Sequence, residues 1–482
     1  MISEINNDSI SQLLEKNLTI HPIYKEKYGE VNTPEHLIQE MLDKLPKNIW
    51  NDPDKKWLDP ASGIGSFQIL VYERLLKGLE HWEPNFKKRH NHIIQNMLYM
   101  CEINPINEKK SRNIFGKNAN IQKCDFLDSS YPTFSVEKFD VILGNPPFNA
   151  SQKYTKKKGG GDSLWPDFVE KSLSLLQPDG ILLYVHPSGW RKPSKKNEVN
   201  TLFKKIAKDH QIEYLEIHSK EDGLKTFGVQ TRYDWYVVKN IPCYDKTLVK
   251  DETGKMQYID LRKWNFLPNC YFSEVKQLLS NKNTTQVIYS RNQYGTDKSW
   301  TRENETMEYK YPLVHSTPMN ETRFYWTNTK HPDVKNPIQM FGLPKVIFGE
   351  SGINDVILDN DGKYGMTQGA IGIKIENEKH GLDLKKALES RGFENILKAL
   401  NFGNFRIDWR IFLYFKQDFY KQFLEEEREK KTILKTYKKN QKNLSQENIL
   451  IQNCRLFQKS KKNLKLKKNK TMKILCQNIH FE

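Results

Sequence analysis

The sequence predicts an α/β fold in which helices cover both faces of a mainly parallel sheet, followed by a second domain of mixed α+β structure. Short apolar segments at 57–59, 139–144 and 181–185 have the length and composition of buried strands. Apolar residues at helical spacing occupy 67–79, after the first strand, and again 168–176, before the last. Strands that alternate with helices in this way are typical of a doubly wound sheet.

Polar residues follow four successive strand candidates of this first domain. Asp59 ends the first strand and runs into the glycine-rich turn 60–65, Glu102 and Asp125 follow the next two strands, and Asn145 follows the fourth. Ligands of open α/β sheets bind beyond the carboxyl ends of the strands. The turn lacks the third glycine of a dinucleotide fingerprint and the lysine of a P-loop. The sequence therefore predicts a ligand site at this edge, with an acid placed for a ribose.

The tetrapeptide Asn145-Pro146-Pro147-Phe148 is the most informative motif in the chain. Its prolines fix φ and donate no backbone hydrogen bond, so the Asn145 side-chain oxygen and the Pro146 carbonyl stand as two acceptors. Phe148 adds an aromatic face. Two acceptors and a ring suit a planar group that bears an NH2, such as adenine. The alternative is a proline-rich loop without a ligand.

The remaining elements continue this pattern. Pro166 stands where a helix begins, 178–180 is a predicted turn, and 199–206 and 231–238 predict a helix and a late strand. In the second domain we expect strands at 344–350 and 366–373, separated by a tight turn at 359–363, and a packed closing helix over 405–420.

In this order the motifs resemble those of the adenine-N6 DNA methyltransferases of bacterial and viral restriction–modification systems, in their gamma arrangement. Residues 28–35 resemble motif X, 59–67 motif I, 102–105 motif II, 125–126 motif III and 145–148 motif IV. The resemblance covers roughly the first 240 residues. It implies a Rossmann-like sheet that binds S-adenosyl-L-methionine. The cofactor-binding residues that it implies are Thr33, Pro34, Asp59, Ala61, Gly63, Gly65, Glu102, Ile103, Asp125, Phe126, Asn145 and Pro147.

The resemblance also assigns roles at the reacting centre. Asn145 and Pro146 would accept hydrogen bonds from N6 of a flipped target adenine, and Phe148 would stack on it. Phe227 would supply a second aromatic wall, although an aromatic residue ahead of a strand is also typical of a core. Lys156, Lys157 and Lys158 stand on a run of three glycines beside motif IV, where they would contact DNA phosphates or form an exposed loop.

Composition and charge add limits. The net charge is +17, and residues 431–482 hold 14 Lys/Arg and 2 Asp/Glu, so 14 − 2 = +12 lies there and 17 − 12 = +5 in the rest. This basic tail is expected to be helical or disordered, or a reading-frame artefact. The six cysteines lack metal-ligand spacing, and there is no signal-peptide or membrane-span pattern. We therefore expect a cytoplasmic protein, in a bacterium or a virus-infected cell, with no metal and no membrane contact.

The sequence thus predicts a catalytic domain over 1–244, a target-recognition domain over 245–425 and the basic tail over 426–482. The resemblance implies double-stranded DNA as partner, action as a monomer, and compatibility with a separately encoded restriction endonuclease. Two alternatives keep the chemistry: methylation of an RNA adenine or a protein glutamine amide, and the methylase part of a combined restriction–methylation enzyme. A catalytically dead DNA-binding module is a third, which the intact Asn145 and Glu102 argue against.

Overall fold

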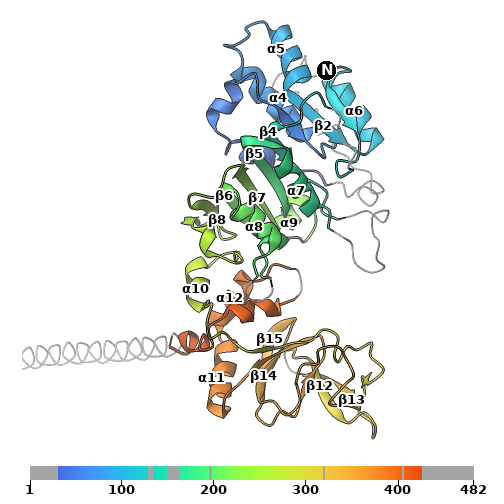
Figure 1. The fold of residues 1–482 in the computed structure, drawn as a ribbon, viewed down its shortest axis with the longest axis vertical. Coiled ribbons are helices and arrows are strands. Elements are labelled where there is room, and N and C mark those ends of the chain that lie inside the picture. The colour runs from blue at the N-terminus through green and yellow to red at the C-terminus, as the bar shows by residue number, and fades with distance from the viewer. Residues whose placement is uncertain are drawn as a thin grey trace, which may run out of the picture.

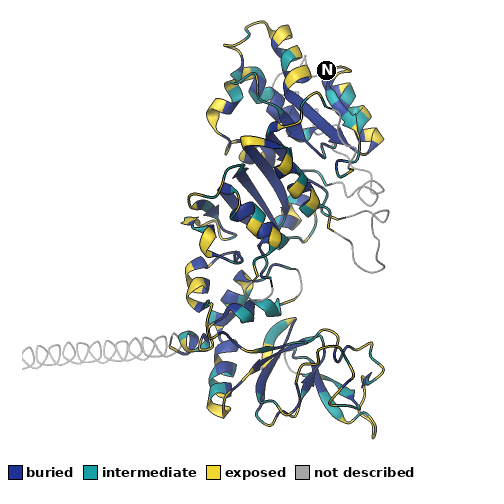
Figure 2. Ribbon diagram, viewed as in Figure 1, coloured by how far each residue is buried: buried dark blue, intermediate teal, exposed yellow. Residues whose placement is uncertain are grey.

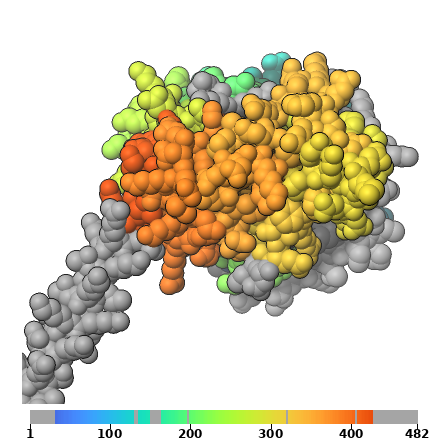
Figure 3. Space-filling view, turned by 90° about the horizontal axis from the view of Figure 1, so that it is seen from below, coloured from blue at the N-terminus to red at the C-terminus, as the bar shows by residue number. Residues whose placement is uncertain are grey.

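The computed structural model describes residues 31–128, 134–149, 163–194, 198–318, 321–403 and 406–425. The first domain lies at one end of the molecule and the second at the other, with α10 (Phe272–Leu278) and α12 (Arg391–Ala399) between them (Figure 1). Seen from the end of the second domain, residues of that domain fill most of the visible face (Figure 3). No helix within the described ranges is long and apolar enough to span a bilayer.

A nine-stranded sheet organises the first domain, with strand order β3-β2-β1-β4-β5-β7-β6-β8-β9. Strands β1 to β5 run parallel to one another, whereas β7 runs antiparallel to both β5 and β6. The strand order reverses between β1 and β4, which confirms the predicted Rossmann-like sheet. The strands are β1 (Trp57–Asp59), β2 (Leu98–Glu102), β3 (Asn120–Lys123), β4 (Phe139–Gly144), β5 (Leu176–Pro187), β6 (Gln211–His218), β7 (Tyr233–Lys239), β8 (Thr247–Lys250) and β9 (Met256–Ile259).

Helices cover both faces of this sheet because successive strand side chains point to opposite faces. Val141 and Leu143 of β4 pack in the core with α3 and α4, whereas Ile142 packs in the core with α7 and α8. Both faces are therefore buried, as Figure 2 shows. The helices are α3 (Glu35–Leu42), η2 (Lys47–Asn51), α4 (Ser66–Gly78), α5 (Phe86–His92), η3 (Ile93–Met97), α6 (Pro105–Phe115), α7 (Trp165–Leu175), η4 (Ser188–Arg191), α8 (Thr201–Ala207) and α9 (Lys220–Phe227).

The structure differs from the sequence expectation at two places in this domain. Strands β8 and β9 extend the sheet to Ile259, beyond the boundary expected at residue 244. The turn expected at 178–180 lies inside β5, where Asp179 has φ 61° and the β4–β5 register shifts. The three turn-forming residues are accommodated as a bulge at the start of the strand.

The second domain contains two four-stranded sheets, of order β10-β17-β14-β15 and β11-β13-β12-β16. The expected strands at 344–350 and 366–373 appear as β14 and as β16 with β17. The closing helix expected over 405–420 is wrong, because η6 is a short 3-10 helix. The elements are η5 (Leu261–Lys263), β10 (Val287–Ile288), β11 (Thr301–Arg302), β12 (Tyr311–Ser316), β13 (Arg323–Thr327), β14 (Lys345–Gly349), β15 (Gly352–Asp359), β16 (Gly365–Met366), β17 (Ala370–Lys374), α11 (Glu378–Leu388) and η6 (Trp409–Tyr414).

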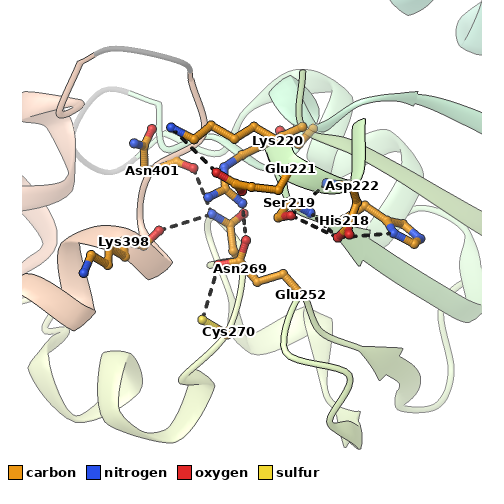
Figure 4. Close-up of polar contacts among 12 residues, drawn as sticks. His218, Ser219, Lys220, Glu221, Asp222, Glu252, Asn269, Cys270, Lys398 and Asn401 are labelled. Atoms are coloured by element: carbon orange, nitrogen blue, oxygen red, sulfur yellow. Dashed lines mark hydrogen bonds and ion pairs between the residues drawn. The ribbon is translucent and has the colours of Figure 1, made fainter. Parts of the chain in front are cut away.

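A buried polar network joins the two domains. Arg191 and Asp234 form an ion pair in which both side chains are fully buried, with Nε to Oδ2 at 2.7 Å. Arg191 also donates to the Asn269 side-chain oxygen at 3.0 Å, and Asn269 donates onward to the Asn401 carbonyl at 2.8 Å. Figure 4 shows Asn269 reaching toward Lys398 and Asn401. The Asn269 side chain thus connects the buried Arg191 of the first domain to the backbone that follows α12.

We expect Asn269→Ala to lower the free energy of unfolding by about 1–3 kcal/mol, because it leaves an Arg191 donor and the Asn401 carbonyl without their buried partner. Urea unfolding followed by circular dichroism measures the change. Asn292→Ala, at an exposed position of the second domain, is the control and should leave stability within about 0.5 kcal/mol. Equal stability of the two variants would contradict the bridging role.

Candidate active site

A partly open cavity lies at the carboxyl ends of β1 to β4. Residues from all four strand ends line it, together with the segment before α3 and one face of α7. The lining residues that the sequence predicts are Thr33, Asp59, Ala61, Gly63, Glu102, Ile103, Asp125, Phe126, Asn145, Pro146 and Pro147. The structure therefore brings together groups that the sequence separates by more than a hundred positions.

Each of the three acidic side chains accepts the same kind of local hydrogen bond from the backbone. The Asp59 carboxylate accepts from the Ala61 backbone N–H at 3.1 Å, Glu102 from that of Asn104 at 2.6 Å, and Asp125 from that of Leu127 at 3.0 Å. In each case the donor lies two residues after the acid, as in an Asx turn. The carboxylates are therefore oriented by the turn that ends each strand.

Asp59 is the most deeply placed of these acids, with 2% of its surface exposed. Burial raises the pKa of its carboxyl to about 7, against the opposing effect of the Ala61 hydrogen bond. Gly144, the last residue of the adjacent strand β4, has φ 145°. A Cβ atom at position 144 would lie 2.9 Å from Asp59 Oδ1. The space for the carboxylate thus depends on a glycine at the end of β4.

Asn145 directly follows β4, and the two polar atoms of its side-chain amide have different surroundings. Its Nδ2 donates to the Thr33 hydroxyl at 3.0 Å. Its Oδ1 is buried and has no hydrogen-bond partner among the residues that the structure describes. A buried unpaired acceptor is costly, so it indicates a ligand donor at this point. Thr33, which the sequence predicts as a cofactor contact, here orients the asparagine.

Aromatic side chains occupy two sides of the site. Phe126 lines the cavity and stacks on Phe168 of α7, with ring centroids 5.1 Å apart and planes 29° apart. Phe148 meets Phe227 edge to face at 6.3 Å. Phe227 is 7% exposed and also packs edge-on against Tyr233. Its side chain is therefore mostly core, with contact to the NPPF aromatic.

Four predicted site residues lie outside the cavity lining: Pro34, Gly65, Phe148 and Phe227. Pro34 precedes α3 at its N-terminus. Gly65 has φ 89°, and a Cβ there would lie 2.6 Å from the Phe115 ring, so this glycine serves helix packing. The expected phosphate contacts Lys156, Lys157 and Lys158 and the tail 426–482 fall outside the described residues, as does the start of motif X.

Sequence reasoning missed part of the lining. Phe168 and Leu164 come from the start of α7, and Cys124 and Leu127 flank Asp125. In the sequence Phe168 belongs to an apolar helical stripe and carries no sign of a ligand contact. No group of three or more His, Cys, Asp or Glu in the described ranges is arranged to hold a metal ion.

We expect Gly144→Ala to destabilise the protein more than Gly116→Ala. Both glycines have positive φ, 145° and 95°, but a Cβ at 116 meets nothing within 4 Å, whereas one at 144 meets the Asp59 carboxylate. Backbone strain alone costs about 1–3 kcal/mol at either site. Urea unfolding of both variants measures the difference, and equal losses would show that the Asp59 contact is unimportant.

Comparison with known proteins agrees with this geometry. Residues 60–223 match the family described as the Eco57I restriction-modification methylase. An uncharacterized adenine-specific methylase of Mycoplasma pneumoniae is 24% identical over 58% of this chain and 83% of its own length. The modification methylase CviBIII of Paramecium bursaria Chlorella virus NC1A is 27% identical over 59% of this chain and 66% of its own length.

A structural likeness extends over both domains. The type IIL restriction-modification enzyme MmeI, solved in complex with DNA, shares the fold over 82% of this chain and 69% of its own, with a TM-score of 0.51 and 12% identity. The family match and the relatives show that the chain is similar to adenine-specific methylases and modification methylases of restriction–modification systems.

Proposed function

We propose that the chain transfers the methyl group of S-adenosylmethionine to N6 of an adenine flipped out of duplex DNA. The observation that carries the proposal is the buried, unpartnered Oδ1 of Asn145 at the edge of the cavity. It supplies an acceptor for an amino group. The setting that we propose is the modification arm of a restriction–modification system, with a separate nuclease.

The residues of the cavity fit S-adenosylmethionine, whose sulfonium supplies an electrophilic methyl group. Glu102 and Asp125 offer oriented carboxylates at adjacent strand ends, for the ribose hydroxyls and the exocyclic amine. Phe126 and the exposed Ile103 offer apolar surface for the cofactor's adenine. Asp59, at the end of β1, would face the positively charged methionine part.

At the reacting centre the chain contributes positioning and electrostatics. A base inside a duplex cannot reach the cavity, so it must leave the stack at a cost of a few kcal/mol. Asn145 and the Pro146 carbonyl would accept from N6, and Phe148 would stack on the ring. With S-adenosylmethionine bound, its methyl group would pass from sulfur to N6, a neutral thioether would remain, and the proton lost from N6 would go to solvent. Because these contacts would orient the N6 lone pair toward the methyl group, the transfer could be direct, without a covalent enzyme intermediate.

The second domain is proposed to recognise the target sequence, and the lysines at 156–158 to contact phosphates. Purified chain incubated with methyl-labelled S-adenosylmethionine tests the activity directly. Duplex DNA should accept label on adenine N6, whereas RNA and glutamine-containing peptides should not. Label on RNA or on peptide alone would favour the alternative substrates.

We expect Asn145→Ala to slow methyl transfer by about 10²–10³-fold, because one oriented group at a reacting centre contributes that much. Cofactor affinity should stay within twofold. Single-turnover transfer and calorimetry measure the two quantities. Asn149→Ala is the matched control, since Asn149 is exposed four residues further along the same loop. Near-normal transfer by Asn145→Ala would overturn the mechanism.

We expect cofactor affinity to rise with pH between about 6 and 7. The free Asp59 carboxyl holds its proton up to a pKa of about 7, whereas a cationic ligand favours the carboxylate, so binding releases a proton below that pH. The affinity should increase by up to about tenfold per pH unit and level off above pH 7. Calorimetry in buffers of different ionisation enthalpy measures the proton release. Asp59→Asn should remove it, and an unchanged pH slope in that variant would contradict the assignment.

A further inference from the structure

A polar cluster in the second domain centres on Glu350, which directly follows β14. The residue is 7% exposed. Its Oε2 accepts from Arg406 at 3.1 Å, and its Oε1 accepts from the Tyr289 hydroxyl at 3.2 Å. Burial raises the pKa of this carboxyl, although Arg406 opposes the effect. A carboxylate is therefore held inside the domain, at a desolvation cost that its two partners offset only in part.

Arg406 is held in place although its side chain is 59% exposed. The next residue, Ile407, donates its backbone N–H to the Glu350 carbonyl at 2.7 Å, so backbone and side chain are fixed to the same residue. Trp409 stacks on the Tyr289 ring at 5.1 Å and 21°, which ties the segment to the hydroxyl donor as well. The guanidinium is thus pre-oriented while most of it faces solvent. An ordinary surface ion pair has no such support.

The segment that carries Arg406 leaves the first domain at the edge that holds the cavity. Phe402 accepts at its carbonyl from the Ser188 hydroxyl at 3.5 Å, and its ring lies 5.7 Å from the Arg191 guanidinium. Ser188 directly follows β5, which runs parallel to β4. Asn145 and the base of the Arg406 segment therefore stand at the carboxyl ends of neighbouring strands.

Two further exposed arginines, Arg291 and Arg323, lie near residues of this part of the domain. Arg291 lies close enough to Glu350 to favour its charged form. Arg323 and Arg406 add to burial in lowering the pKa of His315. Three arginines from three separate segments thus lie near Glu350 or His315, together with the acids Asp408 and Glu303, and Glu350 is the acid that accepts from Arg406.

We propose that Arg406, oriented by Glu350, reads a guanine of the target site in the major groove, whereas Arg291 and Arg323 contact phosphates. The proposal rests on the proposed function. Guanine presents two acceptors, N7 and O6, that a fixed guanidinium matches with two parallel hydrogen bonds. Phosphate contacts need charge but no fixed orientation, and the exposed Arg291 and Arg323 supply that charge.

The test begins with modification-sensitive sequencing, which gives the target site of the wild-type chain. A target without a G·C pair would overturn the inference at once. Single-turnover methylation is then measured on the target duplex and on every single-pair substitution of it. Arg406→Gln should lose roughly 10–100-fold of discrimination at one G·C position and keep it at the others. A uniform loss over all duplexes, or no change, would overturn the inference.

Matched variants distinguish base recognition by Arg406 from a general electrostatic contribution to DNA affinity and from an effect on folding. Arg262→Gln is the control, because Arg262 is also exposed and also paired with a carboxylate, Asp260, but follows β9 at the far edge of the sheet. It should leave discrimination unchanged. Arg291→Gln should weaken all duplexes alike and reduce the slope of log K against log salt by about 0.9. Arg406→Lys keeps the charge and loses the planar fork, so it should share the specificity loss of Arg406→Gln.

Glu350→Gln tests the positioning role. It keeps the size of the side chain and removes the charge that holds Arg406, so discrimination at the same G·C position should fall while cofactor affinity stays unchanged. Loss at a different position, or full discrimination, would contradict the positioning role. Failure of the proposed function is distinguishable, because the wild-type chain would then leave every duplex adenine unmethylated before any variant is made.

Discussion

The register between β1 and its two neighbours determines where every polar group of the cavity stands. Leu58 pairs with Tyr99 of β2 and with Ile142 of β4, so the next residues along all three strands reach the same edge of the sheet. Asp59, Glu102 and Asn145 follow from that alignment. A shift of one residue would move each side chain to the opposite face and bury the acids among apolar residues.

Local turns then refine what the sheet provides. Each carboxylate takes a hydrogen bond from the backbone two residues later, and Asn145 is held by Thr33 from outside the sheet. The turn that follows each strand is therefore enough to orient the acidic side chain. Among the cavity-lining residues that the structure describes, Asn145 has a buried side-chain acceptor without a partner, Oδ1, and the proposed methyl transfer would use this atom. Preorganisation of this kind is what makes a fixed dipole effective in a water-poor site.

The sequence predicts the first domain well because its signals are local: a short apolar run, a breaker and a polar residue lie within ten positions. The signals fail where tertiary packing decides. The sequence does not reveal that a Cβ at Gly65 would meet the Phe115 ring, and β8 and β9 are too short and too polar to be recognised as part of the sheet. The contact between Glu350 and Arg406 spans 56 positions without any shared motif, so only the fold shows it.

The most direct test of the account is modification-sensitive long-read sequencing of DNA from cells that express the chain, beside cells that express its Asn145→Ala variant. The account predicts N6-methyladenine at one short sequence motif in the first DNA and unmodified adenine at the same motif in the second. Unmodified adenine in both samples, or equal methylation in both, would contradict the central claim that this strand-end site methylates DNA adenine through Asn145.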